Sequence, residues 1–302
     1  MIRRRWLLIP ALILATGFNG LGSTSDDDLD RSVEPGKRFV YKQSKDAPED
    51  MEIYFPKDWN PSGRKVPGVI LFHGGGWTGG ALKQFQYACH YFASRGLVAA
   101  TVNYRMLKKN ESKKLSDDKL NTKRTCITSA KSAIRWMKQH ADELGIDPKR
   151  IITGGGSAGG HIAVLATTNP GLNDPDDPKD VDTSVVAYML FNPAFSAKDA
   201  PDTEVDVLNY LKADLPPAIF FFGTVDSWKI GSDEVLKKLK ALGNTTAELW
   251  IAEGQKHSFF NHVPWQDLTI AEADRFLVKH GLLTGDCTLP SPADGKKLEK
   301  AP

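Results

Sequence analysis

The sequence predicts an α/β fold in which a mostly parallel central sheet carries helices on both faces. Two observations support this prediction. Short apolar runs alternate with longer amphipathic stretches from about residue 66 to residue 280. Several of these runs are continuously apolar, which is typical of strands buried on both faces. Strands and helices in alternation form right-handed crossovers, and these place helices on both sides of the sheet.

The expected elements follow one another regularly along the chain. Residues 38–41 and 52–55 alternate in polarity and can form an antiparallel pair ahead of the parallel strands. Gly96 and the Gly-Ile-Asp-Pro run at 145–148 are expected to end the helices before them. Further strands are expected at 66–72, 97–102, 150–153, 185–191, 217–222 and 247–252, and helices at 81–95, 122–144, 158–166, 233–242 and 267–280.

Length and composition indicate one large α/β domain or two smaller ones. The chain has 302 residues, of which 41% are hydrophobic, as in a globular protein with a substantial core. The formal net charge is +2, so no strong attraction to nucleic acid or to a membrane surface is expected. Three Cys residues are too few for a disulfide scaffold, and no bridge is assigned.

The most informative motif is Gly155-x-Ser157-x-Gly159, which lies between an expected strand and an expected helix. A serine at such a sharp turn presents its hydroxyl at the top of the sheet, where it can attack a carbonyl carbon. The flanking residues must be small because the turn is strained and the helix passes close by. Ser157 is therefore the candidate nucleophile.

A serine hydroxyl becomes a good nucleophile only beside a base, and the base needs a carboxylate to orient it. His257 follows the last expected strand, and Asp226 follows the strand before it. Both positions lie at the carboxyl ends of parallel strands, where ligand crevices form. His257 is the expected base, with His262 as its rival, and Asp226 is the expected acid, with Glu253 as the alternative.

Backbone donors for an oxyanion are expected from two places. The His-Gly-Gly-Gly run at 73–76 follows a buried strand, and its glycines let the main chain approach a substrate closely. The expected donors are the N–H groups of Gly74 or Gly75, together with that of Ala158. His73 is expected to orient this loop.

Two side chains are expected to line the substrate site. Trp77 directly follows the glycines and can wall the pocket, with a packed loop anchor as the alternative. His161 lies one turn into the helix after Ser157 and can line the site or cap a carbonyl group. The run at 193–216 is too short for a large cap, which favours an open site.

The glycine-rich loop, the Gly-x-Ser-x-Gly motif and the two expected partners of the serine together resemble the α/β-hydrolase superfamily over about residues 37–283. The chain resembles the carboxylesterases related to hormone-sensitive lipase. The stretch Gly-x-Ser-Ala-Gly-Gly-His at 155–161 is similar to bacterial feruloyl and acetylxylan esterases. Two departures stand out: Gly156 replaces the usual Asp of the elbow, and an Asp-Tyr-Arg-Leu-Ala-Pro-Glu stretch is reduced to Asn-Tyr-Arg-Met at 103–106.

The resemblance implies a serine esterase. We expect a minimal cap, because the segment 193–216 is short, and we expect no cofactor. The substrate would be a short-acyl, feruloyl or acetyl ester on a small molecule or a polysaccharide. Amide, formamide or peptide hydrolysis uses the same triad and stays open. Two other classes also stay open: a dinucleotide-binding protein, since Gly-x-Gly-x-x-Gly fits 74–79 and 154–159, and a non-catalytic binding module. No spacing of His or Cys indicates a metal site.

The two ends of the chain differ from its middle. Residues 1–22 combine three Arg, a short apolar run and small residues, as in an export signal, with an uncleaved anchor as the alternative. We expect a secreted or periplasmic protein with no stable membrane insertion after cleavage. Residues 23–36 are expected to form a flexible linker, 37–283 the catalytic domain, and 284–302 a mobile tail.

Overall fold

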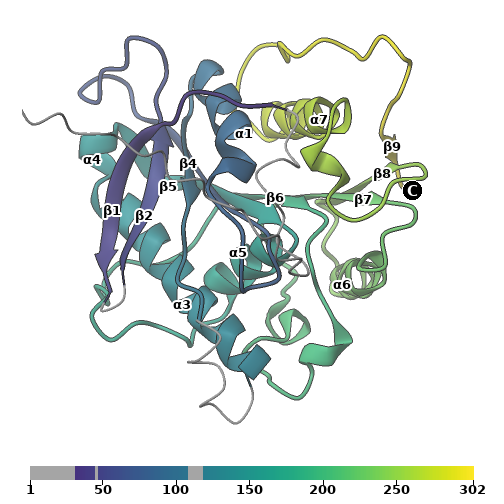
Figure 1. Cartoon of the computed structure of the whole chain (residues 1–302), viewed down its shortest axis with the longest axis horizontal. Coiled ribbons are helices and arrows are strands. Elements are labelled where there is room, and N and C mark those ends of the chain that lie inside the picture. Colours follow the sequence, from purple (N-terminus) through teal and green to yellow (C-terminus); the bar gives the residue numbers. More distant parts are fainter. Residues whose placement is uncertain (1–30, 45–46, 108–117) are drawn as a thin grey trace, which may run out of the picture.

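One sheet organises the part of the chain that the computed structural model describes, which is residues 31–44, 47–107 and 118–302 (Figure 1). Strands β3 to β8 are paired in parallel, whereas β1 with β2, β2 with β4, and β8 with β9 are antiparallel. The spatial order is β1 (Lys37–Gln43), β2 (Pro48–Tyr54), β4 (Val98–Val102), β3 (Val66–Phe72), β5 (Ile146–Gly156), β6 (Ala187–Phe191), β7 (Ala218–Gly223), β8 (Ala247–Ala252) and β9 (Glu299–Lys300).

Helices cover both faces of this sheet because the strands are apolar on both sides. Side chains alternate along β3, so Ile70 and Phe72 join one buried cluster while Val69 and Leu71 join the other. The first cluster includes α3 (Asp118–Gln139), α5 (Ala158–Thr168) and α6 (Lys229–Ala241), and the second includes α1 (Lys83–Ser94) and α7 (Trp265–Lys279). The predicted α/β architecture is confirmed.

Differences from the predicted elements are small and have local causes. The strand that precedes the Gly-x-Ser-x-Gly motif is longer than expected, because it starts at Ile146. The helix expected at 122–144 divides into α3 and the short α4 (Ala141–Leu144), and Gly145 ends α4 in the left-handed conformation.

The segment 284–302, predicted to be a mobile tail, is packed against the domain. The guanidinium group of Arg95 donates to the carbonyl oxygens of Thr284 and Gly285. Leu298 is buried in the cluster that includes α7, and β9 pairs with β8 as the last strand of the sheet (Figure 1). These contacts correct the prediction, which rested on the low apolar content of the segment.

The N-terminal expectations are only partly covered by the described residues. The predicted signal at 1–22 lies outside them, as do the first residues of the predicted linker. Within 31–36, Arg31 forms an ion pair with Asp267 of α7, and Val33 packs against the neighbouring apolar cluster. No helix in the described part of the chain combines the length and the apolar character needed to cross a bilayer.

Candidate active site

Ser157 lies at the sharp turn between β5 and α5. Its backbone has a φ of 51° and a ψ of −117°, a conformation that is strained for a residue with a side chain. A Cβ atom on Gly155 or on Gly159 would lie 2.3 or 1.9 Å from the carbonyl oxygen of Phe72. Because β3 approaches the turn this closely, both flanking positions require glycine.

Three side chains from separate parts of the chain meet beside this turn. The Oγ atom of Ser157 lies 2.8 Å from Nε2 of His257, and Nδ1 of His257 lies 2.8 Å from Oδ2 of Asp226. Asp226 follows β7 and His257 follows β8, so both come from the carboxyl ends of adjacent parallel strands. The Asp226 side chain is fully buried, whereas that of His257 is 27% exposed.

The rival residues lie outside this chain of contacts. His262 is exposed, beyond the loop that carries His257. Glu253 is also exposed, and it accepts a hydrogen bond from the hydroxyl group of Thr224. Neither replaces a member of the Ser157, His257 and Asp226 relay in this structure.

A buried asparagine, missed by the sequence analysis, also contacts the imidazole. Asn192 follows β6, and its Oδ1 accepts the N–H of Ser258 at 3.1 Å. That bond assigns the amide orientation, which directs Nδ2 toward Nε2 of His257 at 3.5 Å. The sequence signal was available, because Asn192 ends a predicted strand on the same edge of the sheet as Ser157.

His73 holds the glycine-rich loop and is itself fully buried. Its Nδ1 donates to the carbonyl oxygen of Gly74 at 2.7 Å, and its ring stacks on Tyr104 at a centroid distance of 4.4 Å. The Tyr104 hydroxyl donates to the carbonyl oxygen of His73 at 2.8 Å. Burial lowers the pKa of His73 to about 4, so the ring is neutral near pH 7. The residue therefore orients the loop.

Of the predicted oxyanion donors, Gly74 has its N–H engaged. That N–H donates to Oε1 of Gln84 in α1 at 2.6 Å, which corrects the expectation that it faces the substrate. The N–H groups of Gly75, Gly76 and Ala158 donate no hydrogen bond to any described residue. The N–H groups left available are thus those of Gly75 and Ala158, which the sequence analysis named, and that of Gly76, which it did not.

The loop and the serine are in close contact. A Cβ atom on Gly74 would lie 3.2 Å from the Cβ of Ser157. The N–H of Gly79 donates to the carbonyl oxygen of Gly75 at 3.0 Å, which closes the loop on itself. The glycine-rich loop therefore packs against the turn that carries Ser157, which is where an oxyanion site needs backbone donors.

His161 does not line the site, contrary to expectation, because it is fully buried. Its Nε2 donates to the carbonyl oxygen of Val205 at 2.8 Å, and its Nδ1 accepts the indole N–H of Trp77 at 3.3 Å. Asp199 also lies 3.5 Å from Nε2 and forms an ion pair with Lys123. Burial lowers the pKa of His161, and the neutral ring caps a carbonyl group.

Trp77 is packed inside the domain and anchors its loop, which was the alternative to a role as a pocket wall. Only 9% of its surface is exposed, and the ammonium group of Lys123 lies 4.0 Å from its ring centroid. Its edge contacts Trp228, whose ring in turn lies 6.1 Å from that of His257. Trp228 is half-buried and comes two residues after Asp226, so it is the missed aromatic neighbour of the site.

Two further observations concern metal ligands and thiols among the described residues. No group of three or more His, Cys, Asp or Glu side chains among them could hold a metal ion. All three Cys residues are present as free thiols. The arrangement described above matches the requirements for acyl transfer: a nucleophile, a base with its orienting acid, and preset backbone donors.

Comparisons with known proteins agree with this chemistry. Esterase 2 of Thermogutta terrifontis is 32% identical, with a TM-score of 0.74 over 85% of this chain and 98% of the esterase. The BD-FAE family model matches residues 51–190. Among curated relatives from Mycobacterium tuberculosis, the carboxylesterase NlhH is 33% identical over 53% of this chain, and the probable carboxylic ester hydrolase LipM is 34% identical over 42%.

The matched segments span 49% of the length of NlhH and 27% of that of LipM, whereas the match to esterase 2 covers nearly the whole enzyme. These likenesses agree with the strand order of the sheet and with the strained turn at the serine. The chain belongs to the α/β-hydrolase esterases, a family of carboxylic ester hydrolases.

Proposed function

We propose that this protein hydrolyses carboxylic esters through an acyl-enzyme formed on Ser157. The observation that carries the proposal is the continuous relay from Oγ of Ser157 through the His257 ring to Asp226, with both contacts at 2.8 Å. Asp226 keeps a proton on Nδ1, which leaves Nε2 free to accept the serine proton.

The reaction would proceed in two halves. Ser157 attacks the ester carbonyl while His257 takes its proton, and His257 then donates that proton to the leaving alcohol. Water enters, and His257 removes one of its protons as the water oxygen attacks the acyl carbon. The bond between that carbon and Oγ of Ser157 then breaks, His257 returns the proton to Oγ, and the acid leaves. Asp226 stabilises the imidazolium in both halves without becoming protonated itself.

The negative charge on the tetrahedral oxygen would be bound by backbone N–H groups. Ala158 begins α5, so its N–H has no partner within the helix, and Gly75 and Gly76 offer donors from the facing loop. Loss of one such donor typically lowers kcat by about 10²–10³-fold. Gly74 contributes indirectly, because its bond to Gln84 fixes the loop.

The substrate class we propose is an ester of a short acyl or aromatic acid. Structures of esterase 2 with propionate and butyrate bound support short acyl groups. The similarity of residues 155–161 to feruloyl and acetylxylan esterases supports feruloyl or acetyl groups, on a small molecule or a polysaccharide. Trp228 would wall the acyl or alcohol side of the site. We further propose a secreted or periplasmic location, which N-terminal sequencing of the mature protein from cell fractions would test.

Turnover of a panel of nitrophenyl esters, from acetate to long acyl chains, tests the proposal. Methyl ferulate, acetylated xylan, a formanilide and a peptide amide complete the panel. Ser157→Ala should lower kcat for the best ester by roughly 10⁴-fold or more, while Ser227→Ala, at an exposed serine nearby, should not. Faster turnover of the amides than of every ester would instead establish an amidase.

A further inference from the structure

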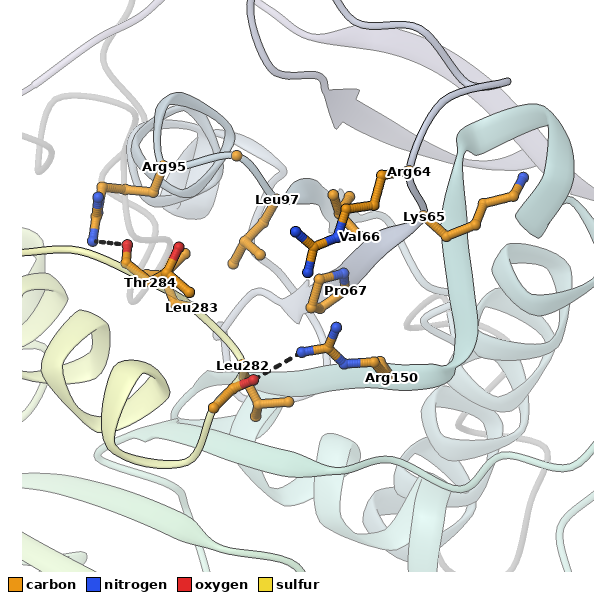
Figure 2. Close-up of a pocket in the computed structure, with 12 residues that line it drawn as sticks. Arg64, Lys65, Val66, Pro67, Arg95, Leu97, Arg150, Leu282, Leu283 and Thr284 are labelled. Carbon is orange, nitrogen blue, oxygen red and sulfur yellow. Dashed lines mark hydrogen bonds between the residues drawn. The ribbon is translucent and has the colours of Figure 1, made fainter.

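A cavity of about 230 Å³ (Figure 2) lies at the opposite end of the sheet from Ser157. It is lined by Val66 and Pro67, where β3 begins, whereas β3 ends at Phe72 beside the glycine-rich loop. A strand rises about 3.3 Å per residue, so roughly 20 Å separates the two places. We call this cavity the basic pocket, and it is distinct from the candidate active site.

Four of the residues that line the basic pocket are cationic and none is acidic; the cationic ones are Arg64, Lys65, Arg95 and Arg150. Two of the four are paired elsewhere. Arg95 forms a buried ion pair with Asp274, and Lys65 pairs with an exposed Asp at position 142. Arg64 and Arg150 contact no carboxylate among the described residues, so their charges are uncompensated.

The geometry of these two arginines suits an anion. Figure 2 shows their guanidinium groups on opposite sides of Pro67, facing the same space, while Lys65 points away. Nη2 of Arg150 donates to the carbonyl oxygen of Gly281 at 2.8 Å, which holds the group in place. Its Nε and Nη1 donors remain without a partner in the described chain, and a preset donor loses little entropy on binding.

Much of the remaining lining is apolar, and this favours an organic anion over a bare inorganic one. Pro67, Leu97, Leu282 and Leu283 contribute hydrocarbon surface next to the guanidinium groups. A bare inorganic ion would leave that surface in contact with water, whereas an organic anion would cover it. Leu282 and Leu283 come from the chain segment after α7, which the contacts of Arg95 hold against the domain.

We propose that the basic pocket binds a small organic carboxylate with an apolar or aromatic body. The carboxylate would lie between Arg64 and Arg150 and accept charge-assisted hydrogen bonds from both. The body would pack on Pro67 and the leucines. This proposal does not depend on the hydrolytic activity, because it involves no residue of the relay.

Calorimetric titration of the full chain at low salt tests the proposal, with benzoate as the probe. Benzyl alcohol serves as the neutral analogue and inorganic phosphate as the bare ion. Arg64→Gln and Arg150→Gln should each weaken benzoate binding at least tenfold. Lys237→Gln removes a positive charge from an exposed position of α6 and should leave the affinity within twofold. Ester turnover by Arg64→Gln should match that of the wild type.

The following binding results would overturn the proposal. Benzoate binding that is absent, or equal in all variants, would show that the arginines recognise no carboxylate. Phosphate binding more tightly than benzoate would show that the pocket selects a bare oxyanion. Benzyl alcohol binding as tightly as benzoate would show that the carboxylate charge contributes nothing to the affinity. If Arg150→Gln lowers Tm, the benzoate affinity of Arg64→Gln is the deciding measurement. Arg64 is exposed and has no partner in the described chain, so its replacement should not affect folding.

Discussion

Oε1 of Gln84 accepts the backbone N–H of Gly74 at 2.6 Å and so ties the glycine-rich loop to α1. Through this bond a helix on one face of the sheet fixes main-chain donors beside Ser157. The same side chain lies close to the turn itself, because a Cβ atom on Gly156 would be 3.2 Å from Oε1. Gln84 is therefore a positioning residue shared by the loop and the nucleophile turn.

Gln84→Leu should lower kcat by roughly tenfold to hundredfold with KM nearly unchanged. The reason is that loss of the acceptor frees the loop, and small displacements of catalytic groups are costly in rate. Gln86→Leu is the matched control, since Gln86 lies on the same helix but donates to Glu52, away from the loop. Steady-state kinetics on a nitrophenyl ester test this prediction. Equal kcat values for Gln84→Leu and Gln86→Leu would exclude a positioning role for Gln84.

Asp226→Asn should lower kcat by about 10⁴-fold, because an amide in that position favours the wrong tautomer of His257. Glu253→Gln makes the same chemical change at the exposed carboxylate that follows β8, and it should retain nearly full activity. Both variants should keep the wild-type Tm within a few degrees. A larger loss of activity in Glu253→Gln than in Asp226→Asn would move the acid to residue 253.

The free energy of unfolding should fall as the pH is lowered from 6.5 toward 4. Burial lowers the pKa of His73 from 6.5 to about 4, so the unfolded chain binds a proton in this range that the folded chain does not. At about 1.4 kcal/mol per pH unit, the loss from His73 alone is about 3 kcal/mol. His161, whose pKa burial also lowers, adds to it in the same direction.

Urea unfolding at pH 7, 6, 5 and 4 measures this dependence. His73→Gln should reduce the slope, because glutamine has no proton to gain, while the contribution of His161 remains. The variant is also expected to lose stability at every pH. An unfolding free energy in the wild type that stays constant from pH 6.5 to 4 would contradict the buried, neutral state of His73.

Gly156→Ala should destabilise the protein by about 1–3 kcal/mol, as overpacking of a tight site does. A Cβ atom there would lie 2.5 Å from Cζ of Phe260, and that ring is held by stacking on Phe85. This contact explains why glycine stands at position 156. Phe260→Leu should relieve most of the added cost in a double-mutant cycle measured by urea unfolding. Additive effects would mean that the ring is not the obstacle.

The sequence was sufficient for features that depend on local pattern and strand order. The parallel sheet, the turn at Ser157 and the placement of Asp226 and His257 all follow from which residues end consecutive apolar runs. Contacts that depend on how one helix or loop is positioned against another could not be predicted from the sequence. The Gln84 bond requires the rotation of α1 about its axis, and the burial of His161 requires the path of the chain near Val205.

Low apolar content also misled the prediction for residues 284–302. That segment is held by a few specific contacts, such as those of Arg95 and the pairing of β9 with β8, instead of by a broad apolar face. The basic pocket could not be predicted from the sequence either. Arg64, Arg95 and Arg150 are far apart in the chain and meet only at the amino ends of parallel strands.

The most direct test of the account is peptide mass spectrometry after treatment with a serine-directed fluorophosphonate. Esterase 2 of Thermogutta terrifontis has been solved in forms phosphonylated by sarin and cyclosarin, so such reagents react with a relative of this fold. We expect one phosphonyl group per chain, on the peptide that contains Ser157, with ester turnover lost in proportion to labelling and no adduct in Ser157→Ala. An adduct on a different residue, or full turnover by protein labelled at Ser157, would contradict the assignment of the nucleophile.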